Sequence, residues 1–264
     1  MDFHQKRTLG RTGLRAGRLG ISSSFGAPAA AYEEAFERGC NYFTWGTFIR
    51  GRSKPMADAV RNIVAQGKRD QLILSMLTYA HQSTLTTFFL ERGLKTLKTD
   101  YTDVLLLGYF PKRPPQKVID GALQLKERGL VRHLGITSHN RRLFVELARE
   151  DIFDVFHFRY SPAHPGAEVD IFPHLPEENR SGMVSFTATD WGNLLKKGKM
   201  PAGEKPLTAA ECYGFVLANP GVDVCMMGAK NRQQMQENLA LLDRGSLEEE
   251  EIERIRRIGR YVHG

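Results

Sequence analysis

Side chains that could do chemistry gather in seven short segments, each at the end of an apolar run of residues. The segments mix hydroxyls, phenols, imidazoles and cations, and they span residues 44–50, 76–79, 108–110, 137–140, 157–161, 186–192 and 228–238. Such groups can exchange protons and bind an anionic small molecule. The spacing does not favour a metal, because the eight histidines form no HExxH-like pattern. Three widely separated cysteines form no CxxC pair, so we expect free thiols at Cys40, Cys212 and Cys225.

A repeated pattern of elements lies between these segments and would position them. Short apolar runs, typical of buried parallel strands, alternate with longer amphipathic runs, typical of helices. The predicted strands are residues 19–25, 41–45, 71–77, 103–107, 132–137, 154–160, 183–188 and 222–227. The predicted helices are residues 31–39, 56–65, 83–97, 118–128, 142–149, 207–218 and 232–242, and the Pro-rich stretch 161–180 has room for only a short one.

Eight strand–helix units predict an α/β fold with one parallel sheet. An open, doubly wound sheet would alternate in the same way, but no GxGxxG motif follows the first strand. We therefore predict a (β/α)₈ TIM barrel, with residues 1–264 as one domain, close to the typical length of about 250 residues. A β-hairpin at residues 7–14 and an extra C-terminal helix at 247–261 complete it. In a barrel all seven segments meet at the C-terminal ends of the strands.

The net charge of the chain helps to predict which kinds of partner it binds. The chain has 37 basic and 30 acidic residues and a net charge of +7, compatible with nucleic acid, an anionic membrane or an anionic small ligand. Basic residues are spread along the chain near acids, which is also typical of a mildly basic solvated surface. We predict a small-molecule ligand and neither a nucleic-acid nor a membrane partner. The chain has no long apolar run and no secretory signal at its start, so the expected location is cytoplasmic. The sequence indicates neither a substrate nor an oligomeric state.

Five strings in the chain together resemble the aldo-keto reductase family. They lie in the family's order at residues 7–14, 37–43, 94–107, 129–135 and 218–238. The resemblance implies carbonyl reduction with NADPH, in which a tyrosine, tuned by a lysine–aspartate pair and a histidine, protonates the carbonyl oxygen. At these four positions the chain has Thr44 for the aspartate, Ile49 for the tyrosine, Met76 for the lysine and Gly108 for the histidine. None of the four can transfer or tune a proton in the usual way.

The resemblance also implies a set of cofactor-binding residues. Gly228, Lys230, Gln234 and Asn238 match the segment that holds the adenosine phosphate, where Lys230 would meet the 2′-phosphate of NADP. On the nicotinamide side the matching residues are Thr137, Ser138, His157, Phe186 and Thr187. Alternatives stay open for three of them: Lys230 as a solvated residue at a helix start, Phe186 as core, and His157 as a satisfied interior histidine.

Two residues at predicted strand ends are candidates for the missing acid, namely Arg50 as an oxyanion donor and Tyr109 as a phenol. Tyr79 is a third, and each could instead be a surface or packing residue. The sequence thus supports an NADP-dependent oxidoreductase with a non-standard active site. The alternative is a catalytically inactive barrel that binds a nucleotide or other ligand as a sensor or regulatory partner. A scaffold role has no specific support beyond the fold.

Overall fold

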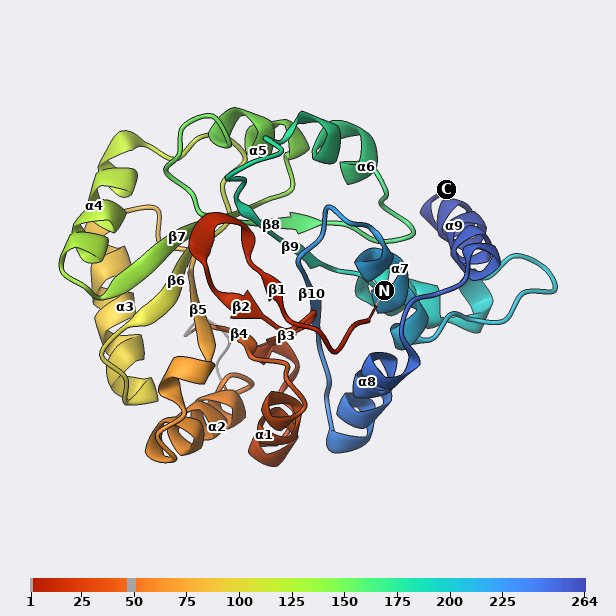
Figure 1. The fold of residues 1–264 in the computed structure, drawn as a ribbon, viewed down its shortest axis with the longest axis horizontal. Helices are drawn as coiled ribbons and strands as arrows, with labels where there is room; N and C mark the ends of the chain where they lie inside the picture. Colours follow the sequence, from red (N-terminus) through yellow and green to blue (C-terminus); the bar gives the residue numbers. More distant parts are fainter. Residues whose placement is uncertain (1, 47–50) are drawn as a thin grey trace.

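Eight parallel strands close into a barrel in the computed structural model, which describes residues 2–46 and 51–264 (Figure 1). The strands pair in chain order, and the last pairs with the first. They are β3 (Leu19–Ser22), β4 (Tyr42–Trp45), β5 (Ile73–Thr78), β6 (Thr102–Leu107), β7 (Val131–Ser138), β8 (Val155–Arg159), β9 (Gly182–Phe186) and β10 (Val224–Met227). The predicted (β/α)₈ fold is confirmed.

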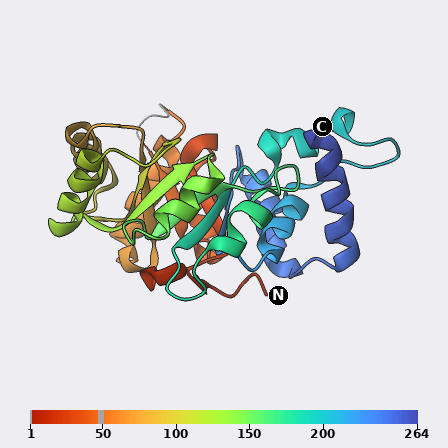
Figure 2. The same cartoon turned by 90° about the horizontal axis from the view of Figure 1, so that it is seen from above.

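Helices surround the barrel and cover its outer face (Figures 1 and 2). They are α1 (Ala29–Glu37), α2 (Lys54–Ala65), α3 (Ser83–Leu97), α4 (Gln116–Glu127), α5 (Arg141–Leu147), α6 (Ala167–Asp170), α7 (Ala209–Ala218) and α8 (Arg232–Arg244). Short 3₁₀ turns include η2 (Ser23–Phe25) and η5 (Asp190–Leu195). The first predicted strand is three residues too long, because the Ser22 hydroxyl accepts a hydrogen bond from the Ser24 N–H and starts η2.

The two predicted additions are both present. Strands β1 (Arg7–Thr8) and β2 (Arg15–Ala16) form the hairpin, and its Leu9 and Ala16 are buried with the side chains inside the barrel, which closes the floor. Helix α9 (Glu249–His263) lies on the outside near α7 and η5. It buries Ile255 and Ile258 and leaves its charged face to solvent, as its apolar spacing requires.

A carboxylate or amide side chain begins every second strand at the floor of the barrel. Each accepts a hydrogen bond from a backbone N–H of the preceding strand or, for Asn41, from the Gly17 N–H just before that strand. The four are Asn41 before β4, Asp103 in β6, Asp154 before β8 and Asp223 before β10. These bonds pair backbone groups that the sheet leaves open at its edge, and they fix the register of the strands from below.

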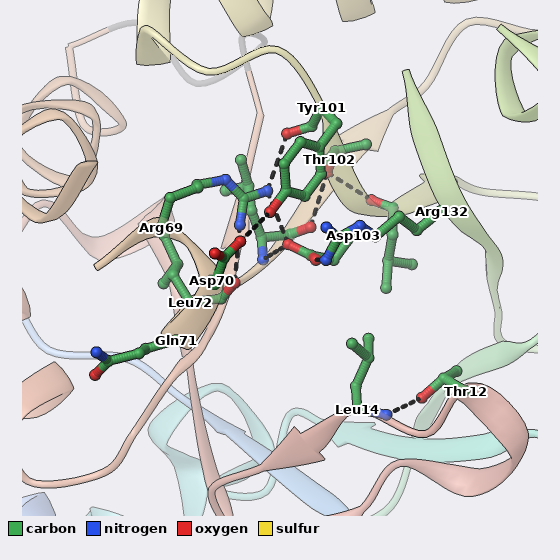
Figure 3. Close-up of polar contacts among 12 residues, drawn as sticks. Thr12, Leu14, Arg69, Asp70, Gln71, Leu72, Tyr101, Thr102, Asp103 and Arg132 are labelled. Carbon is green, nitrogen blue, oxygen red and sulfur yellow. Dashed lines mark hydrogen bonds and ion pairs between the residues drawn. The ribbon is translucent and has the colours of Figure 1, made fainter. Parts of the chain in front are cut away.

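Asp103 is paired with two arginines (Figure 3). The guanidinium groups of Arg69 and Arg132 lie 2.9 and 3.2 Å from its oxygens, and the carboxylate is almost fully buried. Both guanidinium groups also lie 4.0 Å from the centre of the Tyr101 ring. Two cations around one acid and one aromatic ring form a compact, fully satisfied cluster.

Within the described ranges, no helix has the length and apolar character required to cross a membrane.

Candidate active site

The alternation of side chains along each strand decides which residues face the mouth of the barrel. The interior cluster contains Tyr42, Ile73, Val104, Val155, Val184, Val224 and Met226. Counting by twos from these residues, the mouth-facing positions at the strand ends are Thr44, Leu77, Gly108, Arg159 and Phe186, with Thr137 on β7. These residues form the wall of the candidate site.

The residue that the resemblance places at the lysine position, Met76, does not face the mouth. Met76 points outward: its Cε would lie 2.2 Å from a Cβ atom at Gly93 on α3, and the residue is buried between barrel and helix. Its neighbour Leu77 faces the mouth instead, with its Cδ1 next to Gly108. Because successive side chains of a strand alternate between faces, a slip of one residue exchanges interior for exterior. Leucine supplies no amine either.

Thr44 and Gly108 do face the mouth, as the resemblance implies. The Thr44 hydroxyl is buried with the Met226 sulfur 3.9 Å away, and Gly108 offers only its backbone. The other two residues, Ile49 at the tyrosine position and the candidate Arg50, lie outside the described residues.

The missing side chain at Gly108 leaves space that Tyr79 enters. A Cβ atom built at Gly108 would lie 3.1 Å from the Tyr79 ring and 3.0 Å from the Thr137 methyl group. Tyr79 is half exposed, and burial raises the pKa of its phenol. Tyr109 lies on the rim, with its ring 4.9 Å from that of His139. Of the two candidate phenols, Tyr79 is the one that reaches the wall of the site.

His157 lies one layer below the mouth and is almost fully buried. Its Nε2 is 2.8 Å from the Tyr42 hydroxyl, inside the barrel. Burial lowers the pKa of the imidazole to about 3, so the ring is neutral at physiological pH. A buried phenol needs an acceptor for its proton, which favours Tyr42 as the donor and Nε2 as the acceptor. The interior-histidine interpretation of His157 accounts for this contact.

Arg159, at the end of β8, is a charged group in the site that the sequence did not single out. It pairs in register with Phe186 on β9, and its guanidinium lies 5.5 Å from the centre of the exposed Trp191 ring. Phe186 faces the mouth, and its ring is 5.6 Å from that of His139, which follows β7. Its spacing could have identified Arg159 from the sequence, because it lies two residues after His157 on one predicted strand and so shares a face with it.

The other predicted residues on this side are largely engaged with the protein's own backbone. The Ser138 hydroxyl donates to the Phe110 carbonyl at 2.6 Å and accepts from the Asn140 N–H, which anchors the loop after β6. Thr187 has a φ of +63° and accepts a hydrogen bond from the Asp190 N–H. A β-branched residue in the left-handed region is strained.

The segment between β10 and α8 forms a tight, capped turn. The Asn231 side chain caps α8 by accepting from the Gln234 N–H. The Gln234 side-chain Oε1 accepts from the Lys230 N–H at 2.9 Å, and the Asn238 side-chain amide donates to the Gly228 carbonyl. A side chain at Gly228 would collide with the Phe25 ring, which covers it. Gln234 and Asn238 thus shape the turn. Lys230 is exposed, and no carboxylate of the described residues pairs with its ammonium group.

The described residues outside the mouth include three cysteines and one surface cavity. Cys40, Cys212 and Cys225 are buried, and burial raises the pKa of the Cys40 and Cys225 thiols to about 12. Over residues 2–46 and 51–264, no three His, Cys, Asp or Glu side chains are grouped as a metal would require. A surface cavity of about 420 Å³ lies between α5 and α6, away from the mouth, and includes Arg142, Glu146 and His174.

The fold and the arrangement of the mouth define a TIM barrel that carries its candidate site at the C-terminal ends of the strands. The model of the Aldo/keto reductase family matches residues 16–206, more than half of the chain. The chain belongs to the aldo/keto reductase family.

Similar proteins agree with this assignment. The Uncharacterized oxidoreductase YqkF of Bacillus subtilis is 22% identical, with 94% of each chain covered. Aldo-keto reductase family 1 member D1 of Rattus norvegicus is 26% identical, over 59% of this chain and 54% of that protein. Among solved structures, the holo form of aldo-keto reductase AKR11C1 from Bacillus halodurans has a TM-score of 0.79 at 20% identity, covering 96% of both chains. An aldo-keto reductase from Klebsiella pneumoniae in complex with NADPH has a TM-score of 0.76 at 18% identity, covering 97% of this chain and 95% of that one.

Proposed function

We propose that this protein is an oxidoreductase that binds NADP(H) across the barrel mouth and works without the family's usual proton relay. The observation that carries the proposal is Lys230, an exposed cation without a carboxylate partner in the described ranges, placed just before the capped start of α8. A cation beside the N–H groups of a helix start suits a phosphate group. The Klebsiella relative crystallised with NADPH supports the same class of ligand.

The chemistry of the remaining donors fits such a cofactor. Phe186 offers an aromatic face at the mouth, one strand away from the segment that carries Lys230, and such a face suits stacking on a nicotinamide ring. Thr137 offers a hydroxyl on the adjoining wall. When bound, NADPH supplies a hydride to a carbonyl carbon. The cofactor would lie with its phosphate end at Lys230 and its ring end at Phe186.

The carbonyl oxygen then needs a hydrogen-bond donor that can deliver a proton. We assign this role to Tyr79, because its ring enters the space that Gly108 leaves beside Thr137. The raised pKa of Tyr79 keeps the phenol protonated at neutral pH, so it can donate, but it makes the phenol a weak acid. A phenol with a raised pKa gives up its proton less readily, so we expect slow turnover compared with an enzyme whose phenol has a lowered pKa.

Titration with NADPH, followed by cofactor fluorescence, tests the binding half of the proposal. Lys230→Ala should weaken NADPH by about tenfold or more and leave NADH nearly unchanged, because only NADPH carries the 2′-phosphate. Lys199→Ala, which removes another lysine that is exposed, is the matched control. Equal losses for the two cofactors would show that Lys230 does not bind the phosphate.

A second candidate, a catalytically inactive barrel that binds a nucleotide as a sensor, is favoured by the residues Thr44, Leu77 and Gly108 around the mouth. Stopped-flow oxidation of bound NADPH with a panel of aldehydes and quinones separates the two. Tyr79→Phe should slow the oxidation about 100-fold if the phenol donates the proton. Tight NADPH binding without oxidation by any member of the panel would instead favour the sensor.

A further inference from the structure

Arg159 is a cation at the mouth of the barrel whose charge no carboxylate of residues 2–46 and 51–264 neutralises. It is half-buried at the end of β8, at a register position that faces the interior. In the described part of the chain, no carboxylate forms an ion pair with it and no side-chain or backbone acceptor hydrogen-bonds it. Asp190, the acid of the segment after β9, is engaged with His164 and Asn193 instead.

The surroundings of Arg159 are aromatic. The Arg159 guanidinium carbon lies over the Trp191 ring, 5.5 Å from its centre. His139 from the end of β7 and Phe186 from β9 belong to strands that are not neighbours, yet their rings are 5.6 Å apart, so both lean over the end of β8. The Arg159 charge also contributes, after burial, to the lowered pKa values of His139 and His164, which places it near both imidazoles.

We propose that Arg159 binds the carboxylate of the molecule that enters the mouth, and that the substrates are carbonyl compounds that carry a carboxylate. The substrate class rests on the reductase function proposed above, whereas the binding of a carboxylate by Arg159 does not. A guanidinium fork matches a carboxylate with two parallel hydrogen bonds. The rings of Phe186, His139 and Trp191 would cover the apolar body of such a molecule.

The strand order favours a substrate carboxylate over a cofactor phosphate. Arg159 is on β8, Phe186 on β9, and Lys230 follows β10, so the Phe186 strand separates the two cations. A cofactor with its adenosine phosphate at Lys230 would keep that phosphate two strands away from Arg159. The anion at Arg159 would then belong to a second molecule at the mouth.

The test uses the full-length protein without cofactor and two small probes of equal shape, benzoate and its neutral analogue benzamide. Binding is followed by Trp191 fluorescence and by the NMR shifts of the His139 ring. In the wild type, benzoate should bind at least about tenfold more tightly than benzamide. Arg159→Gln should abolish this preference. Arg142→Gln, which removes an exposed arginine from α5, should preserve it.

Equal binding of the two probes by the wild type, or a preference that survives in Arg159→Gln, would overturn the proposal. So would a loss of NADPH affinity of about tenfold or more in Arg159→Gln, because Arg159 would then be a phosphate ligand of the cofactor. Unchanged NADPH affinity in that variant supports the assignment. If the wild type binds no NADPH, the proposed function fails, and the benzoate comparison still decides the role of Arg159.

Discussion

The two ends of this barrel are built from the same eight strands, yet they differ in whether their charged side chains have partners. At the floor, Asp103 and Asp223 are buried and satisfied by arginines and backbone N–H groups. At the mouth, Arg159 and Lys230 have no carboxylate partner among the residues described.

The comparison indicates where stability and function are located. A buried ion pair holds its partners in one geometry, and removal of either partner is costly. An unpaired cation beside aromatic rings contributes little to folding but can bind an anion. This division agrees with the general rule for such barrels, in which the C-terminal face carries the chemistry and the N-terminal face carries stability.

The floor should show the largest effect on folding. Asp103→Ala leaves Arg69, Arg132 and the Leu74 N–H without their common acceptor. We expect the free energy of unfolding to fall by about 3–5 kcal/mol, as measured by urea denaturation. Asp100→Ala, which removes an exposed acid nearby, is the control. A loss below about 1 kcal/mol would remove the basis for the contrast between the two ends.

Asp154 gives the floor a pH dependence. Burial alone would raise its pKa, but hydrogen bonds from His133 and the Leu134 N–H, together with the Lys126 charge, lower the pKa below its usual value. A carboxyl whose pKa is lower in the folded state stabilises the protein above its unfolded pKa, and this contribution is lost as the pH falls through the folded value. Asp154→Asn should cost about 1–3 kcal/mol at pH 7.

The difference between wild type and Asp154→Asn should shrink below about pH 4, where the unfolded carboxyl takes up its proton. Urea unfolding at several pH values measures it. A difference that stays constant down to pH 2 would show that the charge of Asp154 is not what stabilises the floor.

Relief of backbone strain at the mouth should increase the stability of the protein. Thr187→Gly replaces a β-branched residue at a φ of +63° by one that adopts this angle freely. We expect the free energy of unfolding to rise by about 1 kcal/mol, as measured by thermal and urea denaturation. A decrease would mean that contacts of the Thr187 side chain outweigh the backbone strain.

The smallest effect on stability is expected for Arg159→Gln, within about 0.5 kcal/mol of wild type. The pKa of His139 should nevertheless rise, because the variant removes a nearby positive charge while the effect of burial remains. An NMR titration of the His139 ring measures this change. An unchanged pKa would place the guanidinium farther from His139 than the structure has it.

Much of the fold was predictable because each element is encoded locally. The helix predicted at residues 83–97 matches α3 at both ends, and the apolar run 103–107 lies within β6. The site was less predictable. Met76 and Leu77 are both apolar, and only the pairing of β5 with its neighbours decides which of them faces the interior. The roles proposed for Arg159 and Tyr79 depend on residues of other strands, and local spacing in the sequence does not reveal these neighbours.

The sequence by itself determined the barrel, its hairpin and its last helix, and it predicted that Thr44 and Gly108 stand at positions of the usual proton relay. Strand periodicity and helix amphipathicity are local properties, so they can be read along the chain. The tertiary structure alone decided that Leu77 replaces Met76 in the wall of the site, that His157 pairs with Tyr42, and that Arg159 remains without a partner. Those outcomes depend on strand register and on barrel closure, which bring together residues that are far apart in the chain.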